Sequence, residues 1–123
     1  RAFPYGGSGV ENNKRFYRRE KMAKKLGVFV SSDQHLDKLI DLCKAAQEKG
    51  DVDVTLFFSH LGTLLTQDPR FGELEGMANM SLCNVGFESH NLKPPVQGIA
   101  KEDFATQARN GELIEEGDRY IVF

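Results

Sequence analysis

Residues 26–33 read LGVFVSSD, an apolar run of five residues that three polar residues follow at once. A short run that is apolar at every position is typical of a strand buried on both faces, as in a parallel sheet. Serine and aspartate are favoured helix N-caps, because their side-chain oxygens accept hydrogen bonds from the free N–H groups of a first turn. The stretch therefore predicts a buried strand that leads into a helix.

A helical pattern and a second strand follow. Apolar residues recur at the spacing of one helix face up to a Gly50 stop: Leu36, Leu39, Ile40, Cys43 and Ala46. Residues 54–58 (VTLFF) are rich in β-branched and aromatic side chains, which favours a strand. Strands that alternate with helices over short links indicate right-handed crossovers and a parallel sheet.

The rest of the chain continues this alternation. We predict a short helix over 60–66, a loop over 67–76, a third strand over 78–83, a helical stretch from 84 to 90, a fourth strand over 96–100, a helix over 102–109 that stops at Asn110-Gly111, and a fifth strand over 120–123. The predicted fold class is α/β, a three-layer α/β/α sandwich around a mainly parallel five-stranded sheet.

Length and composition set the domain organisation. The chain has 123 residues, of which 40% are hydrophobic, enough for one domain with a single core. Residues 1–22 are predicted to form an N-terminal tail or arm, and residues 23–123 the α/β domain. The tail is rich in Gly, Ser and Asn, and basic over 13–21. It suits a solvated linker or an arm that docks on a partner subunit.

Charge and cysteine usage limit the kinds of partner and the compartment that we expect for this protein. The 16 basic and 18 acidic residues leave a net charge of −2, which argues against a nucleic-acid or membrane partner and favours proteins or small molecules. There is no apolar run of about 18 residues, and the first residues lack the order of a signal peptide. Although the chain begins with Arg1 rather than Met, we predict a reducing, cytoplasmic setting. Neither Cys43 nor Cys83 has a second cysteine at zinc or thioredoxin spacing.

The most reactive candidate is Cys83. Ligands of parallel sheets bind beyond the carboxyl ends of the strands, where this chain has residues 31–33, Ser59-His60, Cys83-Asn84 and the residues after Ala100. Cys83 is the thiol among them. The positive end of the helix predicted after it would favour the thiolate and lower the pKa. Cys43 shares the apolar helix face, so we predict an inert core position for it.

The three histidines have alternative interpretations. His60 follows the second strand, and His90 lies about two helical turns beyond Cys83, so either is a candidate base or imidazolium beside the thiolate. An exposed or capping histidine is the alternative for both. His35 is predicted to face solvent in the first turn of a helix. Three histidines so dispersed do not indicate a metal site.

Motifs of other α/β classes are missing. The sequence has no Gly-x-Gly-x-x-Gly after the first strand, no Gly-x-x-x-x-Gly-Lys and no Gly-x-Ser-x-Gly. A phosphate-accepting receiver domain would need an aspartate where Cys83 stands. These absences argue against dinucleotide, P-loop, hydrolase and receiver functions.

Four segments together carry a family resemblance: LGVFVSS at 26–32, VTLFF at 54–58, MSLCNV at 80–85 and GDRYIVF at 117–123. In their order and spacing, residues 24–123 resemble the DsrE/DsrF-like sulfur-relay family. The resemblance implies a three-layer parallel-sheet fold, assembly into homo-oligomers, and sulfur carried as a persulfide on Cys83. The chain departs from the Cys-Gly and Cys-x-x-Cys settings of some members, and other members have no known activity.

Three functions follow as hypotheses. In the first, Cys83 accepts sulfane sulfur from a donor protein and passes it to an acceptor protein without a metal or organic cofactor. Ser59, His60 and Asn84 would hydrogen-bond the thiolate or persulfide. In the second, the chain is a non-catalytic oligomeric binding module of the same fold. In the third, it is a flavodoxin-like binder of a nucleotide or flavin.

Overall fold

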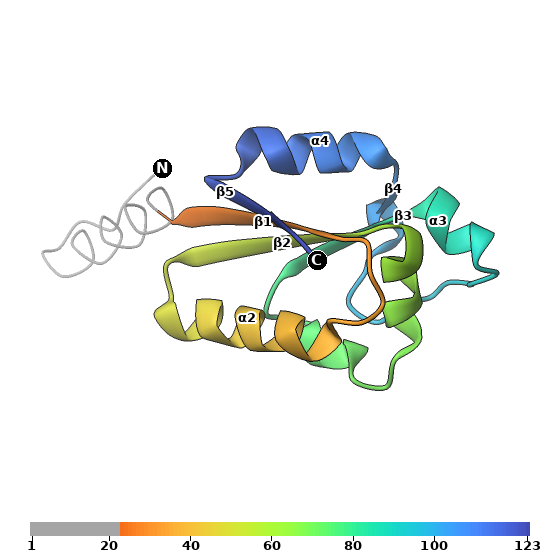
Figure 1. Cartoon of the computed structure of the whole chain (residues 1–123), viewed down its shortest axis with the longest axis horizontal. Coiled ribbons are helices and arrows are strands. Elements are labelled where there is room, and N and C mark those ends of the chain that lie inside the picture. The colour runs from red at the N-terminus through yellow and green to blue at the C-terminus, as the bar shows by residue number, and fades with distance from the viewer. Residues whose placement is uncertain (1–22) are drawn as a thin grey trace, which may run out of the picture.

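Five parallel strands form one sheet in the order β4-β3-β2-β1-β5 (Figure 1). The computed structural model describes residues 23–123, and the predicted tail, residues 1–22, lies outside them. The strands are β1 (Lys24–Val30), β2 (Val52–Phe58), β3 (Asn79–Cys83), β4 (Phe104–Ala105) and β5 (Arg119–Val122). The predicted α/β class and the parallel five-stranded sheet are confirmed.

Helices cover both faces of the sheet, which makes the predicted three layers. Helix α2 (Leu36–Lys49) lies below the sheet in Figure 1 and helix α4 (Gln107–Glu116) lies above it. Alternate residues of each strand point to opposite faces. Val28 and Val30 therefore join the large core between the sheet and α2, whereas Phe57 and Cys83 join a smaller cluster with Leu113 of α4.

Helix α2 carries the predicted apolar face but begins later than the serines suggested. Its buried residues are Leu36, Leu39, Ile40, Cys43 and Ala46, and Gly50 ends it in the left-handed conformation with φ of 83°. The N-cap position belongs to His35, whose side chain caps nothing. His35 is half-buried, with its ring edge-on to Phe123 at 6.2 Å, so the prediction that it faces solvent is wrong.

The link from β2 to β3 consists of two 3-10 helices. The first, η1 (His60–Gln67), occupies the predicted short helix, and the second, η2 (Phe71–Leu74), lies within the predicted loop. Phe71 and Leu74 are buried in the core, which explains why this irregular segment has a defined conformation. Helix α3 (Asn84–Ser89) then begins directly after β3, as predicted.

The predicted fourth strand over 96–100 is wrong. Val96 and Ile99 form only an isolated antiparallel bridge around Gly98, which has a φ of 84°. Their side chains are buried and anchor a loop to the core. After a turn of 3-10 helix, η3 (Lys101–Asp103), the strand that pairs with β3 is β4. The apolar residues at 96–100 were a signal of burial rather than of strand pairing.

The last helix also differs from its predicted bounds of 102–109. Helix α4 begins at Gln107, with Thr106 as its cap, and passes through Asn110 and Gly111 to Glu116. Tertiary contacts outweigh the local Asn-Gly stop signal. Leu113 is buried against the sheet, and the Tyr120 hydroxyl donates a hydrogen bond to Asn110 Oδ1 at 2.8 Å.

Within residues 23–123, no helix combines the length and the apolar character that a bilayer span requires.

Substitution of two glycines tests this fold, because an added Cβ would clash with the backbone at Gly62 and would meet open space at Gly111. A Cβ at Gly62 would overlap the carbonyl oxygen of Val30, so Gly62→Ala should lower the free energy of unfolding by more than about 2 kcal/mol. Gly111, inside α4, has no atom within 4 Å of an added Cβ, so Gly111→Ala should raise it by about 0.5–1 kcal/mol. Urea unfolding measures both. A destabilising Gly111→Ala would mean that α4 stops at that glycine after all.

Candidate functional site

A cavity of about 630 Å³ lies at the carboxyl edge of the sheet, beyond β2, β3 and β4. Ten residues line it: Ser59, His60, Leu61, Cys83, Val85, Gly86, Ser89, His90, Thr106 and Gln107. The cavity thus brings together Cys83, both candidate bases and Ser59. Asn84 lines a separate hollow of about 510 Å³ with residues of α3 and of the loop after it. Two predictions about this edge need correction. Residues 31–33 do not line the cavity, and in place of the residues directly after Ala100 it is Thr106 and Gln107, between β4 and α4, that line it.

Cys83 is the last residue of β3 and the N-cap of α3. The strand alternation turns it to the α4 face of the sheet, where Phe57 and Leu113 form its apolar surroundings. Cys83 lines the cavity, and only 6% of its residue surface is exposed. A reagent or partner has to enter the cavity to reach the sulfur.

Cys43 contrasts with Cys83. It is fully buried under the sheet, and burial raises the pKa of its thiol from an ordinary value of 9.0 to about 11. Desolvation disfavours the charged thiolate, which is the nucleophilic form. Both cysteines are free thiols. The predicted core position of Cys43 is confirmed, and Cys83 is the thiol that remains for chemistry.

His90 is held by two polar contacts. Its Nδ1 lies 2.9 Å from the carbonyl oxygen of Gly86 and 3.3 Å from Thr63 Oγ1. The Thr63 hydroxyl in turn donates to the carbonyl oxygen of His60 at 2.8 Å. These contacts connect the end of α3 to η1 beside the cavity. Thr63 is fully buried, and no sequence pattern had indicated a role for it.

His60 has a different environment. Its backbone adopts the left-handed conformation with φ of 51°, which is uncommon for residues other than glycine. The residue is exposed, and its ring lies edge-on to Phe29 at 6.4 Å. An added Cβ at Gly86 would come within 3.2 Å of the His60 backbone nitrogen, so α3 packs closely on the start of η1.

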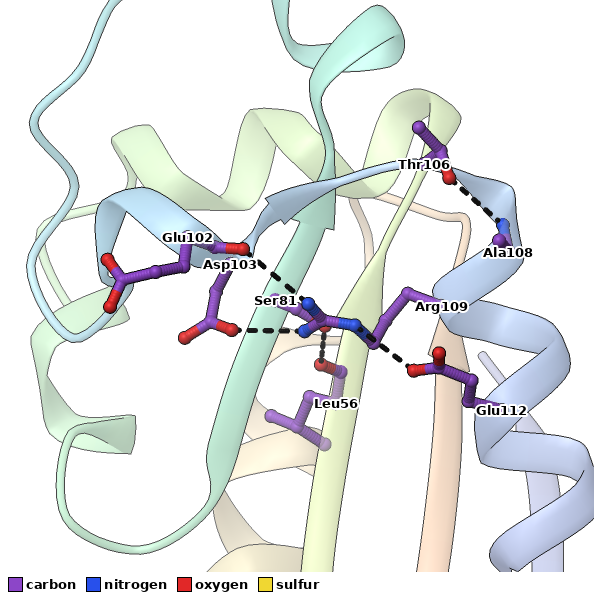
Figure 2. A network of polar contacts seen from close by, with 8 residues as sticks. All are labelled: Leu56, Ser81, Glu102, Asp103, Thr106, Ala108, Arg109 and Glu112. Atoms are coloured by element: carbon purple, nitrogen blue, oxygen red, sulfur yellow. Dashed lines mark hydrogen bonds and ion pairs between the residues drawn. The ribbon is translucent and has the colours of Figure 1, made fainter.

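The first turn of α4 closes the third side of the cavity. Gln107 Nε2 donates to the hydroxyl of Ser59, a buried residue, at 2.7 Å. Figure 2 shows the contacts that hold this turn: Thr106 accepts from the Ala108 N–H, and Arg109 reaches Asp103 at 3.0 Å, the Glu102 carbonyl at 3.5 Å and Glu112 at 3.5 Å. Gln107 was not predicted as a site residue, because the helix that became α4 was predicted to begin at residue 102, which would place Gln107 inside it.

The lining of the cavity consists of polar and apolar side chains. None of the ten lining residues is Lys, Arg, Asp or Glu. Two apolar side chains stand at the cavity and are exposed to solvent, Leu61 at 48% and Val85 at 71%. Among residues 23–123, no three His, Cys, Asp or Glu side chains are grouped to hold a metal ion. The cavity thus combines a thiol, two imidazoles and exposed apolar side chains.

No protein-family model, curated protein or solved structure matches this chain. The function is therefore inferred from the residues of the cavity and from the resemblance in the sequence.

The raised pKa of Cys43 leads to a prediction on stability. Above about pH 9 the unfolded chain releases the Cys43 proton while the folded protein retains it, so the free energy of unfolding falls as the pH rises toward 11. The expected loss by pH 11 is about 2 kcal/mol. Urea unfolding under reducing conditions measures it. Cys43→Val, which cannot ionise there, should lose less stability over this range, and equal losses would contradict the buried-thiol explanation.

Proposed function

We propose that this protein is a sulfur carrier of the DsrE/DsrF-like sulfur-relay type, which holds sulfane sulfur as a persulfide on Cys83. One observation carries the proposal: Cys83 lines a cavity at the carboxyl edge of the sheet together with two imidazoles. The other thiol, Cys43, is buried with its pKa raised to about 11. The resemblance of the sequence points to the same residue.

The transfer needs no metal or organic cofactor. The Cys83 thiolate attacks the outer sulfur of a donor persulfide, the new bond between Sγ and that sulfur forms, and the S–S bond of the donor breaks. The donor leaves as a thiolate, so one sulfur atom moves without net oxidation or reduction. Attack by an acceptor thiolate on the outer sulfur of the Cys83 persulfide then completes the relay.

The surroundings of Cys83 suit a persulfide. Phe57 and Leu113 shield one side of the sulfur from water. Ser59 and His60 line the cavity and are the predicted hydrogen-bond partners within it. The Asn84 side chain lies on a different hollow, so the predicted bond from that residue is not part of the proposal.

The rim of the cavity suits contact with another protein. Leu61 and Val85 expose apolar surface directly beside the entrance to Cys83. Exposed apolar groups near a buried reactive atom favour docking of a partner that reaches inward. We propose sulfur donor and acceptor proteins as the partners, a homo-oligomer as the assembled form, and a reducing, cytoplasmic compartment, in which Cys83 stays a thiol between transfers.

The test is the intact mass of the full chain after incubation with a sulfane-sulfur donor and then with a reducing agent. The expected result is a gain of one sulfur atom that the reductant reverses and that peptide mapping places on Cys83. Cys83→Ser should take up no sulfur, whereas the matched Cys43→Ala variant should load as well as the unmodified chain. Loading of Cys83→Ser to the same extent would overturn the assignment.

A second function has its own support. The 6% exposure of Cys83 and the apolar rim also fit a non-catalytic oligomeric binding module in which the thiol is a bystander. The same incubation separates the two functions. No sulfur gain on a Cys83 that a small alkylating reagent does modify, together with a stable oligomer in native mass spectrometry, would favour the binding module.

A further inference from the structure

Ser59 and Cys83 are neighbours across two adjacent strands. Phe58 of β2 and Leu82 of β3 are partners in the parallel register. The next residue of each strand keeps an extended backbone, with φ and ψ of −142° and 162° at Ser59 and of −82° and 113° at Cys83. Adjacent strands lie about 4.8 Å apart, and side chains alternate between the faces along each strand. Ser59 and Cys83 therefore lie side by side at the end of the sheet.

Both side chains point to the face that α4 covers. Ser59 follows Phe57 by two residues and so points to the same side of β2, and Phe57 and Cys83 share a cluster with Leu113 of α4. Gln107, in the first turn of α4, reaches Ser59 on this face: its Nε2 donates to the Ser59 hydroxyl at 2.7 Å. Ser59 is only 1% exposed and lines the cavity together with Cys83. The strand register and the contact with α4 thus agree on the direction of the hydroxyl.

The contact with Gln107 decides where the hydrogen of the hydroxyl can go. A serine hydroxyl has one hydrogen to donate and two lone pairs that accept. One lone pair receives the Gln107 amide, and within residues 23–123 the hydroxyl makes no other hydrogen bond. Its hydrogen thus has no acceptor in that part of the chain, although the residue is buried beside the sulfur of Cys83. A buried donor of this kind favours a bound group that accepts.

We infer that the Ser59 hydroxyl donates this hydrogen to the outer sulfur of a Cys83 persulfide and that Gln107 is the positioning residue that turns the hydroxyl toward it. The inference rests on the proposed function of Cys83. An S–S bond extends about 2 Å beyond Sγ, a length that brings the outer sulfur toward a side chain on the adjacent strand. The ionised outer sulfur is an anionic acceptor, so the hydrogen bond is charge-assisted.

Ser59 is better placed for this bond than His60, the other predicted partner. The backbone of His60 leaves the strand through the left-handed conformation with φ of 51°. Its ring lies edge-on to Phe29 of β1 at 6.4 Å. In the sheet, β1 and β3 lie on opposite sides of β2, so the His60 ring is directed away from the strand that carries Cys83.

The experiment measures how far Cys83 is loaded at equilibrium. The full chain is incubated with glutathione persulfide and glutathione at a fixed ratio, and intact mass with peptide mapping gives the fraction of Cys83 that carries the extra sulfur. Ser59→Ala removes the donor, so the equilibrium constant for loading should fall about tenfold, the effect of one hydrogen bond to a charged group. An unchanged constant would overturn the inference.

Gln107 has a matched pair of variants. In Gln107→Glu the carboxylate accepts the Ser59 hydrogen and turns it away from the sulfur, so loading should fall about as far as in Ser59→Ala. In Gln107→Met the hydroxyl has no partner on α4 and samples three staggered positions, so loading should fall only about threefold. Loading of Gln107→Glu to the level of the unmodified chain would refute the positioning role.

The double variant Ser59→Ala/Gln107→Glu separates positioning from a direct effect of the added charge. If Gln107 acts through Ser59, the double variant should load as Ser59→Ala does, because two residues that act as one unit are not additive. A further loss in the double variant would mean that the carboxylate repels the persulfide directly, and it would overturn the assignment of Gln107.

Alkylation of the unloaded thiol identifies a merely structural effect. In the thiol form no hydrogen bond joins Ser59 to Cys83 within residues 23–123, so iodoacetamide should modify Cys83 at the same rate in every variant. Equal losses of alkylation and loading would mean that the substitutions disturb the site, which counts against the inference. Loading that Ser59→Ala leaves unchanged would overturn this inference and keep the proposed function, whereas a chain that takes up no sulfur on Cys83 would refute both.

Discussion

The candidate site depends on the junction where β1 and β2 end side by side. The Val30 carbonyl accepts a hydrogen bond from the Ser59 N–H at 2.9 Å, and Gly62 packs against the same carbonyl with no room for a Cβ. These contacts draw the start of η1 tightly over the end of the sheet. The chain turns there through the left-handed conformation of His60, which aims η1 toward α3.

Three consequences of that turn meet in the cavity. The His60 carbonyl is presented to the Thr63 hydroxyl, which in turn faces Nδ1 of His90. Ser59, buried by the same junction, receives the Gln107 amide and thereby ties the first turn of α4 to the cavity. Cys83 reaches the same cavity because β3 pairs with β2 in parallel as far as Phe58 and Leu82, just before the edge of the sheet. Hydrogen bonds made by side chains thus link η1 to the end of α3 and to the first turn of α4.

Local patterns predicted the elements whose burial is periodic and failed where burial has another cause. The strand predicted from 26–30 and the helix face ending at Cys43 and Ala46 were correct. A strand between two layers leaves a continuous apolar run, and a helix with one buried side leaves its period in the sequence. Val96 and Ile99 are equally apolar but anchor a loop, so the strand predicted there does not exist. Asn110-Gly111 has the local signature of a helix stop, yet burial of Leu113 carries α4 past it.

The sequence by itself determined the α/β class, the parallel sheet, the core position of Cys43 and the placement of Cys83 at the end of a strand, since each depends on residues close together along the chain. The tertiary structure alone decided that Thr63, 27 positions from His90, contacts Nδ1 of that ring, and that Gln107, 48 positions from Ser59, donates a hydrogen bond to its hydroxyl. Such contacts leave no periodic trace, because they depend on how strands and crossovers are brought together in space rather than on the spacing of residue types along one element.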